Sequence, residues 1–485
     1  MIITRRKALM SALFGAGYVG LRALATGIPA TVLLKGRRAF ADGAPACINR
    51  AKAQFIVLAT SGSGDPINAN VPGTYADPLI THSADPTMAA TAMTLGGRPT
   101  TAALPWTQLP QSVLDRTTFW HIMTNTPVHP KQPDVLKLMG MAAQDEMLPS
   151  LLAKQLAPCL GTVQAQPITV GANSPSEGLS FSGQALPIIP PLALKATLTM
   201  PTGPLANLVT LRDQTLSQIS DLYRNTGNAA QKAYLDSLIA SQSEIRNIRQ
   251  DLLASLTSIK DNSVASQITA AIALIQMNVT PVIAIHIPFG GDNHNDAALG
   301  NEARQTVSGV ASIASLMSQL ASAGLSDQVT FMSLNVFGRT LGPRNTDGRQ
   351  HNPNHQVSIT IGKPFKPGVI GAVGPVAGDY GALAINSQTG AGGAGGDIDA
   401  GSTLASFGKT TLAAVGLDSS TVDASPSPNY SPHRRLRPSH RGHLVAYGRF
   451  SLVKYVQYYP RCASGRAPVP LRPVQIPADH AMSSR

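Results

Sequence analysis

The chain has 485 residues, of which 43% are hydrophobic, 13% charged and 5% aromatic, a composition typical of a folded globular protein and not of a disordered one. This length allows one large α/β unit or two to four ordinary domains. The net charge of +12 comes from the two ends, because residues 1–41 contribute +7 and residues 431–485 contribute +9, which leaves −4 for the body. A mildly acidic body argues against a surface that binds nucleic acid.

The first 41 residues have the pattern of an export signal. Thr4-Arg5-Arg6-Lys7 precedes an apolar stretch over residues 8–34, and Ala39-Phe40-Ala41 offers a small-x-small cleavage site. Paired arginines favour the twin-arginine (Tat) export machinery and a periplasmic or secreted protein. An ordinary Sec signal and a retained membrane anchor are the alternatives. Arg22 interrupts the apolar stretch, so no stable membrane span is expected after processing.

Cysteine usage gives little further information. The three cysteines are Cys47, Cys159 and Cys462, and an oxidising periplasm would permit a disulfide between the first two. The odd count and the absence of short spacings leave this pairing open. No Cys-x-x-Cys pair occurs, which disfavours a thiolate zinc site.

Apolar runs predict the elements of the first half of the body. Residues 54–60 read as a buried first strand that opens into a glycine-rich turn carrying Asp65. Residues 70–118 are predicted to be a long surface excursion, and residues 117–123 a second strand. His121, inside that apolar run, is interpreted as a core residue, whereas His129 could be a ligand or a plain loop residue. Helical spacing follows at residues 135–147 and 149–156.

The second half contains the polar loops. Residues 205–260 predict amphipathic helices inserted into the domain. Residues 280–289 predict a strand that feeds the loop GGDNHND at 290–296, followed by a helix at 297–323 and a strand at 329–336. A strand–helix–strand unit of this spacing implies a parallel pair. The loops after both strands should therefore emerge at the same edge of the sheet, where open α/β sheets bind ligands.

The remaining residues complete a three-part organisation. A strand is predicted at 357–361, a loop at 371–400, and a helix from 401 to 415 that stops at Gly416. From residue 425 the composition changes to Pro, Arg, His and Tyr, which predicts a basic, disordered tail or the product of a shifted reading frame. The expected organisation is a signal at 1–41, an α/β domain at 42–424 and a tail at 425–485.

Four motifs occur in a recognisable order: GSGDPIN at 62–68, Asp292-Asn-His294, FGRT at 337–340 and Gly348-Arg-Gln-His351. Together with the paired-arginine leader, this order is similar to that of the Tat-exported domain-of-unknown-function family 1501, which is grouped with the alkaline phosphatase and sulfatase superfamily. The resemblance spans most of residues 1–420, and its third and fourth motifs are the most specific part.

The resemblance implies an alkaline phosphatase-like α/β sandwich, with a largely parallel central sheet flanked by helices. It also implies one or two divalent metal ions, zinc or similar, at the carboxyl edge of the sheet, where they assist hydrolysis of a phosphate or sulfate ester. The metal ligands carried over are Asp65, Asp292, His294 and His351. A small anionic ester would then be bound by Arg339, Arg349 and Asn68, although Arg339 could instead form a structural salt bridge.

Two departures from the family pattern keep a second hypothesis open. Gln350 stands where the family has Asp, and no Ser, Thr or Cys has an evident activating base, although Thr60, Ser61 and Ser63 precede Asp65. The first hypothesis is therefore a metal-dependent ester hydrolase. The alternative is a non-catalytic periplasmic binding or accessory protein that retains the fold.

Overall fold

The computed structural model describes Cys47 and residues 49–140, 146–162, 164–181, 183–198, 255–342 and 347–417, with positions 218 and 221. The predicted signal at 1–41, nearly all of the predicted insertion at 205–260 and the tail at 425–485 lie outside these residues. Within the described part of the chain, no helix is both long and apolar enough to cross a membrane.

A seven-stranded sheet forms the centre of the molecule, in the order β13-β4-β12-β9-β1-β8-β5. Six strands run in one direction, and only β12 is antiparallel to its neighbours β9 and β4. The fold is thus mixed α/β with a mostly parallel sheet. The strands are β1 (Phe55–Ser61), β4 (Thr117–Ile122), β5 (Ile168–Thr169), β8 (Val282–Ile285), β9 (Val329–Asn335), β12 (Gln356–Ile361) and β13 (Gly368–Ile370).

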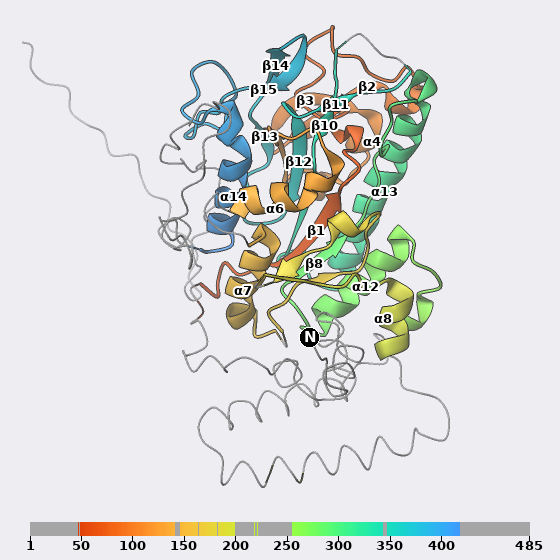
Figure 1. Ribbon diagram of the computed structural model, residues 1–485, viewed down its shortest axis with the longest axis vertical. Coiled ribbons are helices and arrows are strands. Elements are labelled where there is room, and N and C mark those ends of the chain that lie inside the picture. The colour runs from red at the N-terminus through yellow and green to blue at the C-terminus, as the bar shows by residue number, and fades with distance from the viewer. Residues whose placement is uncertain are drawn as a thin grey trace, which may run out of the picture.

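Both faces of the sheet are covered by helices (Figure 1). Successive residues of β1 alternate between two cores, because Cβ atoms of a strand point to opposite faces: Val57 packs in one core and Ile56 and Leu58 in the other. All seven residues of β1 are buried, as expected for a strand between two helical layers. One layer holds α8 (Pro191–Leu198), α12 (Val264–Gln276) and α13 (Gly300–Ser322), and the other α6 (Gln132–Gly140), α7 (Leu148–Leu160) and α14 (Thr403–Ala414).

Shorter strands, helices and turns lie outside the seven-stranded sheet. The prediction of a surface excursion at 70–118 is wrong, because this segment forms a hairpin and two short helices and buries Trp106 against Phe119 and Phe289. These elements are β2 (Ala90–Leu95), β3 (Arg98–Ala103), α4 (Leu104–Thr107) and α5 (Gln111–Leu114). The others are β6 (Ser180–Phe181), β7 (Gln184–Ala185), β10 (Gly338–Arg339), β11 (His351–Asn352), β14 (Val373–Val376), β15 (Asp379–Ala382), and the 3-10 turns η1 (Pro66–Ala69), η2 (Pro86–Met88), η3 (His129–Lys131), η4 (Pro175–Glu177), η5 (Ala297–Leu299) and η6 (Ala400–Ser402).

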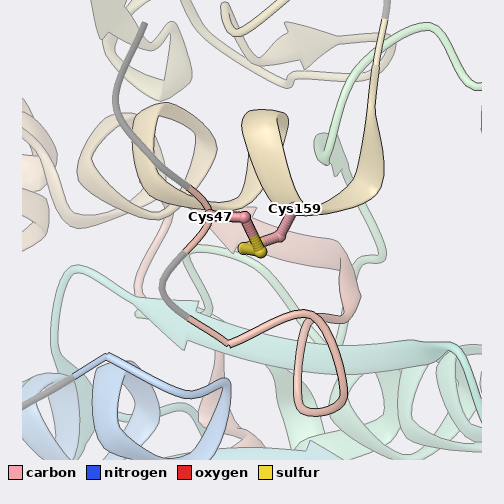
Figure 2. The surroundings of a disulfide bond; sticks show 2 residues. All are labelled: Cys47 and Cys159. Atoms are coloured by element: carbon pink, nitrogen blue, oxygen red, sulfur yellow. A yellow bond between two sulfur atoms is a disulfide. The ribbon is translucent and has the colours of Figure 1, made fainter.

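A disulfide joins Cys47 to Cys159, across 112 positions of the sequence (Figure 2). Cys159 lies in the last turn of α7, and the chain before β1 carries Cys47. The Cα atoms of the two cysteines are 4.5 Å apart, within the range of disulfide-bonded pairs. The bridge therefore fixes the beginning of the described chain to the helical layer that contains α7.

The reversed direction of β12 shapes the functional edge. Because β12 is antiparallel to β9, the chain between them turns back at the carboxyl edge of the sheet and does not cross to the other end. This connection contains β10 and β11, which pair antiparallel with Arg339 opposite His351. A crossover to a parallel β12 would have taken His351, which lies just before β12, to the opposite edge of the sheet.

Candidate metal centre

The candidate site lies above the carboxyl ends of four strands that run in the same direction. The loops after β1, β4, β8 and β9 supply, respectively, residues 61–65, 124–131, 290–296 and 336–350, and all four leave the same edge of the sheet. Ligand sites of open α/β sheets occur at this edge because the loops there converge. The predicted meeting of the loops after β8 and β9 is confirmed by the contact between Asp292 and Arg339.

Three side chains converge as possible metal ligands: His129, Asp292 and His351. One ligand atom from each lies within 4.8 Å of the other two. The carboxylate of Asp292 is shared, since Oδ2 lies 3.4 Å from Nε2 of His129 and Oδ1 lies 3.9 Å from Nε2 of His351. Two imidazoles and one carboxylate form a donor set suited to zinc or a similar ion.

Backbone carbonyls orient both imidazoles toward Asp292. Nδ1 of His129 donates to the Gly62 carbonyl at 2.8 Å, and Nδ1 of His351 donates to the Pro127 carbonyl at 2.5 Å. With the proton on Nδ1, the lone pair of each ring is on Nε2, the atom that faces the cluster. Such a hydrogen bond behind the ligand is the usual way in which proteins fix a metal-binding histidine. The ring of Phe337 packs against both imidazoles.

His294 extends the cluster on one side. Its Nε2 atom lies 2.9 Å from Nε2 of His351 and 3.2 Å from Oδ1 of Asp292. Since His351 carries its proton on Nδ1, the bond between the two rings requires His294 to donate from Nε2. In the other tautomer, with its proton on Nδ1, His294 could provide Nε2 as a further ligand for an ion held by Asp292 and His351.

Arg339 keeps Asp292 ionised. Its guanidinium is fully buried and donates from NH2 to Oδ1 of Asp292 at 2.7 Å. Partial burial raises the pKa of Asp292, but the hydrogen bond and positive charge of Arg339 outweigh it and hold that pKa below its usual value. For His351, burial lowers the pKa in spite of the bond to Pro127. The centre therefore favours a carboxylate and a neutral imidazole, the protonation states that metal binding requires.

Asp65 lies beside the cluster and outside it. The side chain is buried, and Oδ1 accepts from the backbone N–H of Gly291 at 2.7 Å, which fixes the loop that carries Asp292. Its other oxygen, Oδ2, is buried without a hydrogen-bond partner. Burial raises the pKa of this carboxyl group. An unpartnered buried oxygen leaves Asp65 one free acceptor, which suits the predicted role as a metal ligand without testing it.

A buried ion pair holds two of the loops together. Arg349 donates from Nε to Glu302 at 2.7 Å, and both side chains are at most 1% exposed. Glu302, in the first turn of α13, also accepts from the side chains of Asn70 and Asn293. The backbone N–H of Arg349 donates to the Asn293 carbonyl at 2.9 Å. The loop of Asp292 and the loop of His351 are therefore fixed to the same carboxylate.

The structure brings together most of the residues predicted for the site. Asp292, His294 and His351 are neighbours, and Asp65 contacts their loop through Gly291. Three residues predicted to bind substrate are buried and engaged within the protein: Asn68 pairs with the backbone of Arg339, Arg349 binds Glu302, and Arg339 binds Asp292. Contact with substrate stays a prediction for these residues.

His129 is the site residue that the sequence left undecided. It lies in the loop after β4, and no short motif connects it to Asp292 or His351. The direction of β4 in the sheet, once known, would have placed this loop at the same edge. No protein-family model matches the sequence, and none of the curated proteins with which it was compared is similar to it.

Proposed function

We propose that this chain is an exported, metal-dependent hydrolase that acts on phosphate or sulfate esters. The observation that carries the proposal is the convergence of His129, Asp292 and His351, with both imidazoles held by backbone carbonyls so that Nε2 faces the carboxylate. The proposal includes membership of domain-of-unknown-function family 1501 and an alkaline phosphatase-like fold. Its support is the order of the motifs and a mostly parallel sheet with the site at the carboxyl edge.

The residues fit a divalent ion of the zinc type. His129, Asp292 and His351 would hold the ion, which would supply activation of a water for attack on an ester. Asp292 offsets the charge of the ion and is itself held by Arg339. His129 and His351 supply directional nitrogen donors, and their rings are exposed by 33% and 23%, which leaves them accessible from solvent.

Export is supported by two independent features. The leader contains paired arginines before an apolar stretch, the pattern that the Tat route uses for folded proteins. The Cys47–Cys159 disulfide is the second feature, because such bonds form and persist in oxidising compartments such as the periplasm.

The direct test measures metal content and turnover together. Purified mature protein should contain at least one tightly bound divalent ion and hydrolyse nitrophenyl phosphate or nitrophenyl sulfate. His129→Gln and Asp292→Asn should lose both properties, whereas Asp327→Asn, at the opposite edge of the sheet, should retain them. Turnover that is equal in wild type and the two site variants would refute the assignment of the site.

The alternative is a non-catalytic periplasmic protein that binds a metal or a ligand without turnover. It is favoured by Gln350, which replaces a charged residue of the family pattern, and by Arg339 and Arg349, which are buried and paired with acidic residues. Tight metal binding without hydrolysis of either ester would support this alternative over the enzyme.

A further inference from the structure

A second carboxylate–imidazole pair lies behind the metal centre. Glu177, at the end of η4, is fully buried and accepts from Nδ1 of His286 at 2.9 Å. The same carboxylate accepts from the backbone N–H groups of Gly62 and Asn173, each at 3.1 Å. His286 follows β8, and its own N–H donates to the side chain of Gln267 at 2.8 Å. Neither Glu177 nor His286 belongs to the cluster of possible metal ligands.

The turn at residues 62–64 lies between this pair and the metal centre. Its three carbonyl groups all face the centre: Gly62 accepts from Nδ1 of His129, Ser63 accepts from NH2 of Arg339, and Gly64 accepts from Nε of Arg339. The orientation of the 62–64 turn therefore determines where His129 and Arg339 point. Arg339 in turn holds Asp292, so the turn supports two of the three converging side chains.

Glu177 holds the other side of the same turn. Its Oε1 atom accepts from the N–H of Gly62, and Asn173 donates from Nδ2 to Oγ of Ser63 at 3.1 Å. The approach is close, because a Cβ atom on Gly62 would lie 2.9 Å from Oγ of Ser176. Residues 173–177 thus hold the 62–64 turn on the side away from the metal centre.

His286 lowers the free-energy cost of burying the Glu177 carboxylate. A fully buried carboxylate is costly unless its oxygens are hydrogen-bonded and its charge is compensated. Burial lowers the pKa of His286, but the hydrogen bond and charge of Glu177 outweigh it and raise that pKa above its usual value. The imidazole thus supplies a donor to Glu177, and the raised pKa favours its charged form, which compensates the carboxylate.

We propose that Glu177 and His286 are positioning residues of the metal centre, which act through the 62–64 turn to fix the tautomer and direction of His129. This inference rests on the proposed metal-binding function, but the orientation of His129 can be tested without a metal. It assigns no catalytic contact to either residue. It predicts that disrupting the pair changes His129 selectively and leaves His351, which is held by Pro127, unchanged.

The test uses full-length mature protein with labelled histidine, in which NMR reports the tautomer of each ring. The His129 signal is assigned by its absence from His129→Gln. In metal-free wild type, His129 should carry its proton on Nδ1. Glu177→Met, which has similar length and no acceptor oxygen, should give a mixture of tautomers for His129 only. His286→Asn retains a donor near the position of Nδ1 and should preserve the wild-type signal, whereas His286→Leu should not.

Cobalt(II) binding by the same proteins separates this inference from the proposed function. Affinity should fall about 10-fold in Glu177→Met and His286→Leu, as for other residues behind metal ligands, and stay unchanged in His286→Asn and in the distant control Asp327→Asn. A wild type that binds no cobalt but shows the tautomer change would refute the metal centre and retain the positioning role. An unchanged His129 tautomer in Glu177→Met and His286→Leu would overturn the inference, whatever the affinity.

Discussion

Gly348 lies directly against the backbone of His294. A Cβ atom on Gly348 would come within 2.3 Å of the His294 carbonyl oxygen and 2.5 Å of the Asn293 carbonyl oxygen. The residue also has a φ of +136°, which side-chain-bearing residues rarely adopt. This contact is where the loop of Asp292 meets the loop of His351, so the glycine of the Gly-Arg-x-His motif sets the distance between possible metal ligands.

Gly348→Ala should therefore separate the two loops. We expect cobalt affinity to fall by at least about 10-fold and the free energy of unfolding by about 1–3 kcal/mol, from backbone strain and the enforced shift. Titration and urea unfolding measure these changes. Gly324→Ala is the matched control, because Gly324 also has positive φ but no atom within 4 Å of its Cβ position. Equal metal affinity in Gly348→Ala and wild type would contradict this account.

His129 and Asp65 should contribute differently to metal binding. His129→Gln removes a nitrogen donor of the three-residue cluster. Metal affinity should therefore fall by more than roughly 100-fold, the upper end of the range for residues that only hydrogen-bond to a metal ligand. Asp65→Asn keeps an oxygen that can accept from Gly291, so the loop should stay in place. A metal stoichiometry that falls by one ion in Asp65→Asn would identify Asp65 as a ligand, and an unchanged stoichiometry would limit it to supporting the loop.

Breaking the buried ion pair between Glu302 and Arg349 should cause a large loss of stability. Arg349→Met leaves the carboxylate of Glu302 buried without its cation, which should lower the free energy of unfolding by about 3–5 kcal/mol. Adding Glu302→Gln removes the unpaired charge and should recover part of the loss. For comparison, Arg116→Met breaks the exposed pair with Asp327 and should cost less than about 1 kcal/mol. Urea unfolding of the four proteins decides between these outcomes, and similar losses in Arg349→Met and Arg116→Met would refute the prediction.

Acid should destabilise the fold through a buried histidine pair. His355 and His121 are both fully buried, and Nε2 of His355 donates to Nδ1 of His121, whose Nε2 donates to the Pro72 carbonyl. Burial lowers the pKa of His121 from 6.5 to about 4. Above pH 6.5 the ring is neutral in both states. As pH falls from 6.5 toward 4, the unfolded state takes up the proton first, so the contribution of His121 to stability decreases there and stops changing below pH 4. Burial also lowers the pKa of His355 well below its usual value, so this ring adds to the loss.

His121→Gln tests this pH dependence. The glutamine amide can donate to the Pro72 carbonyl but does not titrate, so the variant should lose less stability between pH 6.5 and 4 than wild type. Urea unfolding at several pH values measures the difference, which cancels the contribution of carboxylates common to both proteins. Parallel pH profiles in the two proteins would show that His121 does not titrate on unfolding.

The Cys47–Cys159 disulfide should contribute to stability because it closes a long loop, although this contribution grows only with the logarithm of loop length. Replacing both cysteines by serine, or reducing the wild type, should lower the free energy of unfolding by about 2–5 kcal/mol. The reduced wild type and the double variant should then behave alike. Loss of the reductant effect in a single Cys462→Ser variant would mean that a bond to Cys462 is responsible.

Local sequence patterns were enough to predict the main strands and the meeting of the two polar loops at one edge of the sheet. The runs that became β1, β4, β8 and β9 are locally apolar, and apolar periodicity depends only on near neighbours in the chain. The βαβ spacing around α13 then required the loops after β8 and β9 to leave the same edge. This spacing is why the loop of Asp292 and His294 could be expected beside the loop that follows β9, whereas the grouping of His351 with them came from the order of the motifs.

Which side chains face each other across the site became clear from the three-dimensional fold alone. It brought in His129 from the loop after β4, gave β12 its reversed direction, and engaged Arg339 and Arg349 with Asp292 and Glu302. These outcomes depend on strand direction and on packing between residues far apart in the chain, such as Ser63 and Arg339, which are 276 positions apart. A local pattern contains no information about such partners, because the energy of a buried charge or donor depends on what the fold places beside it.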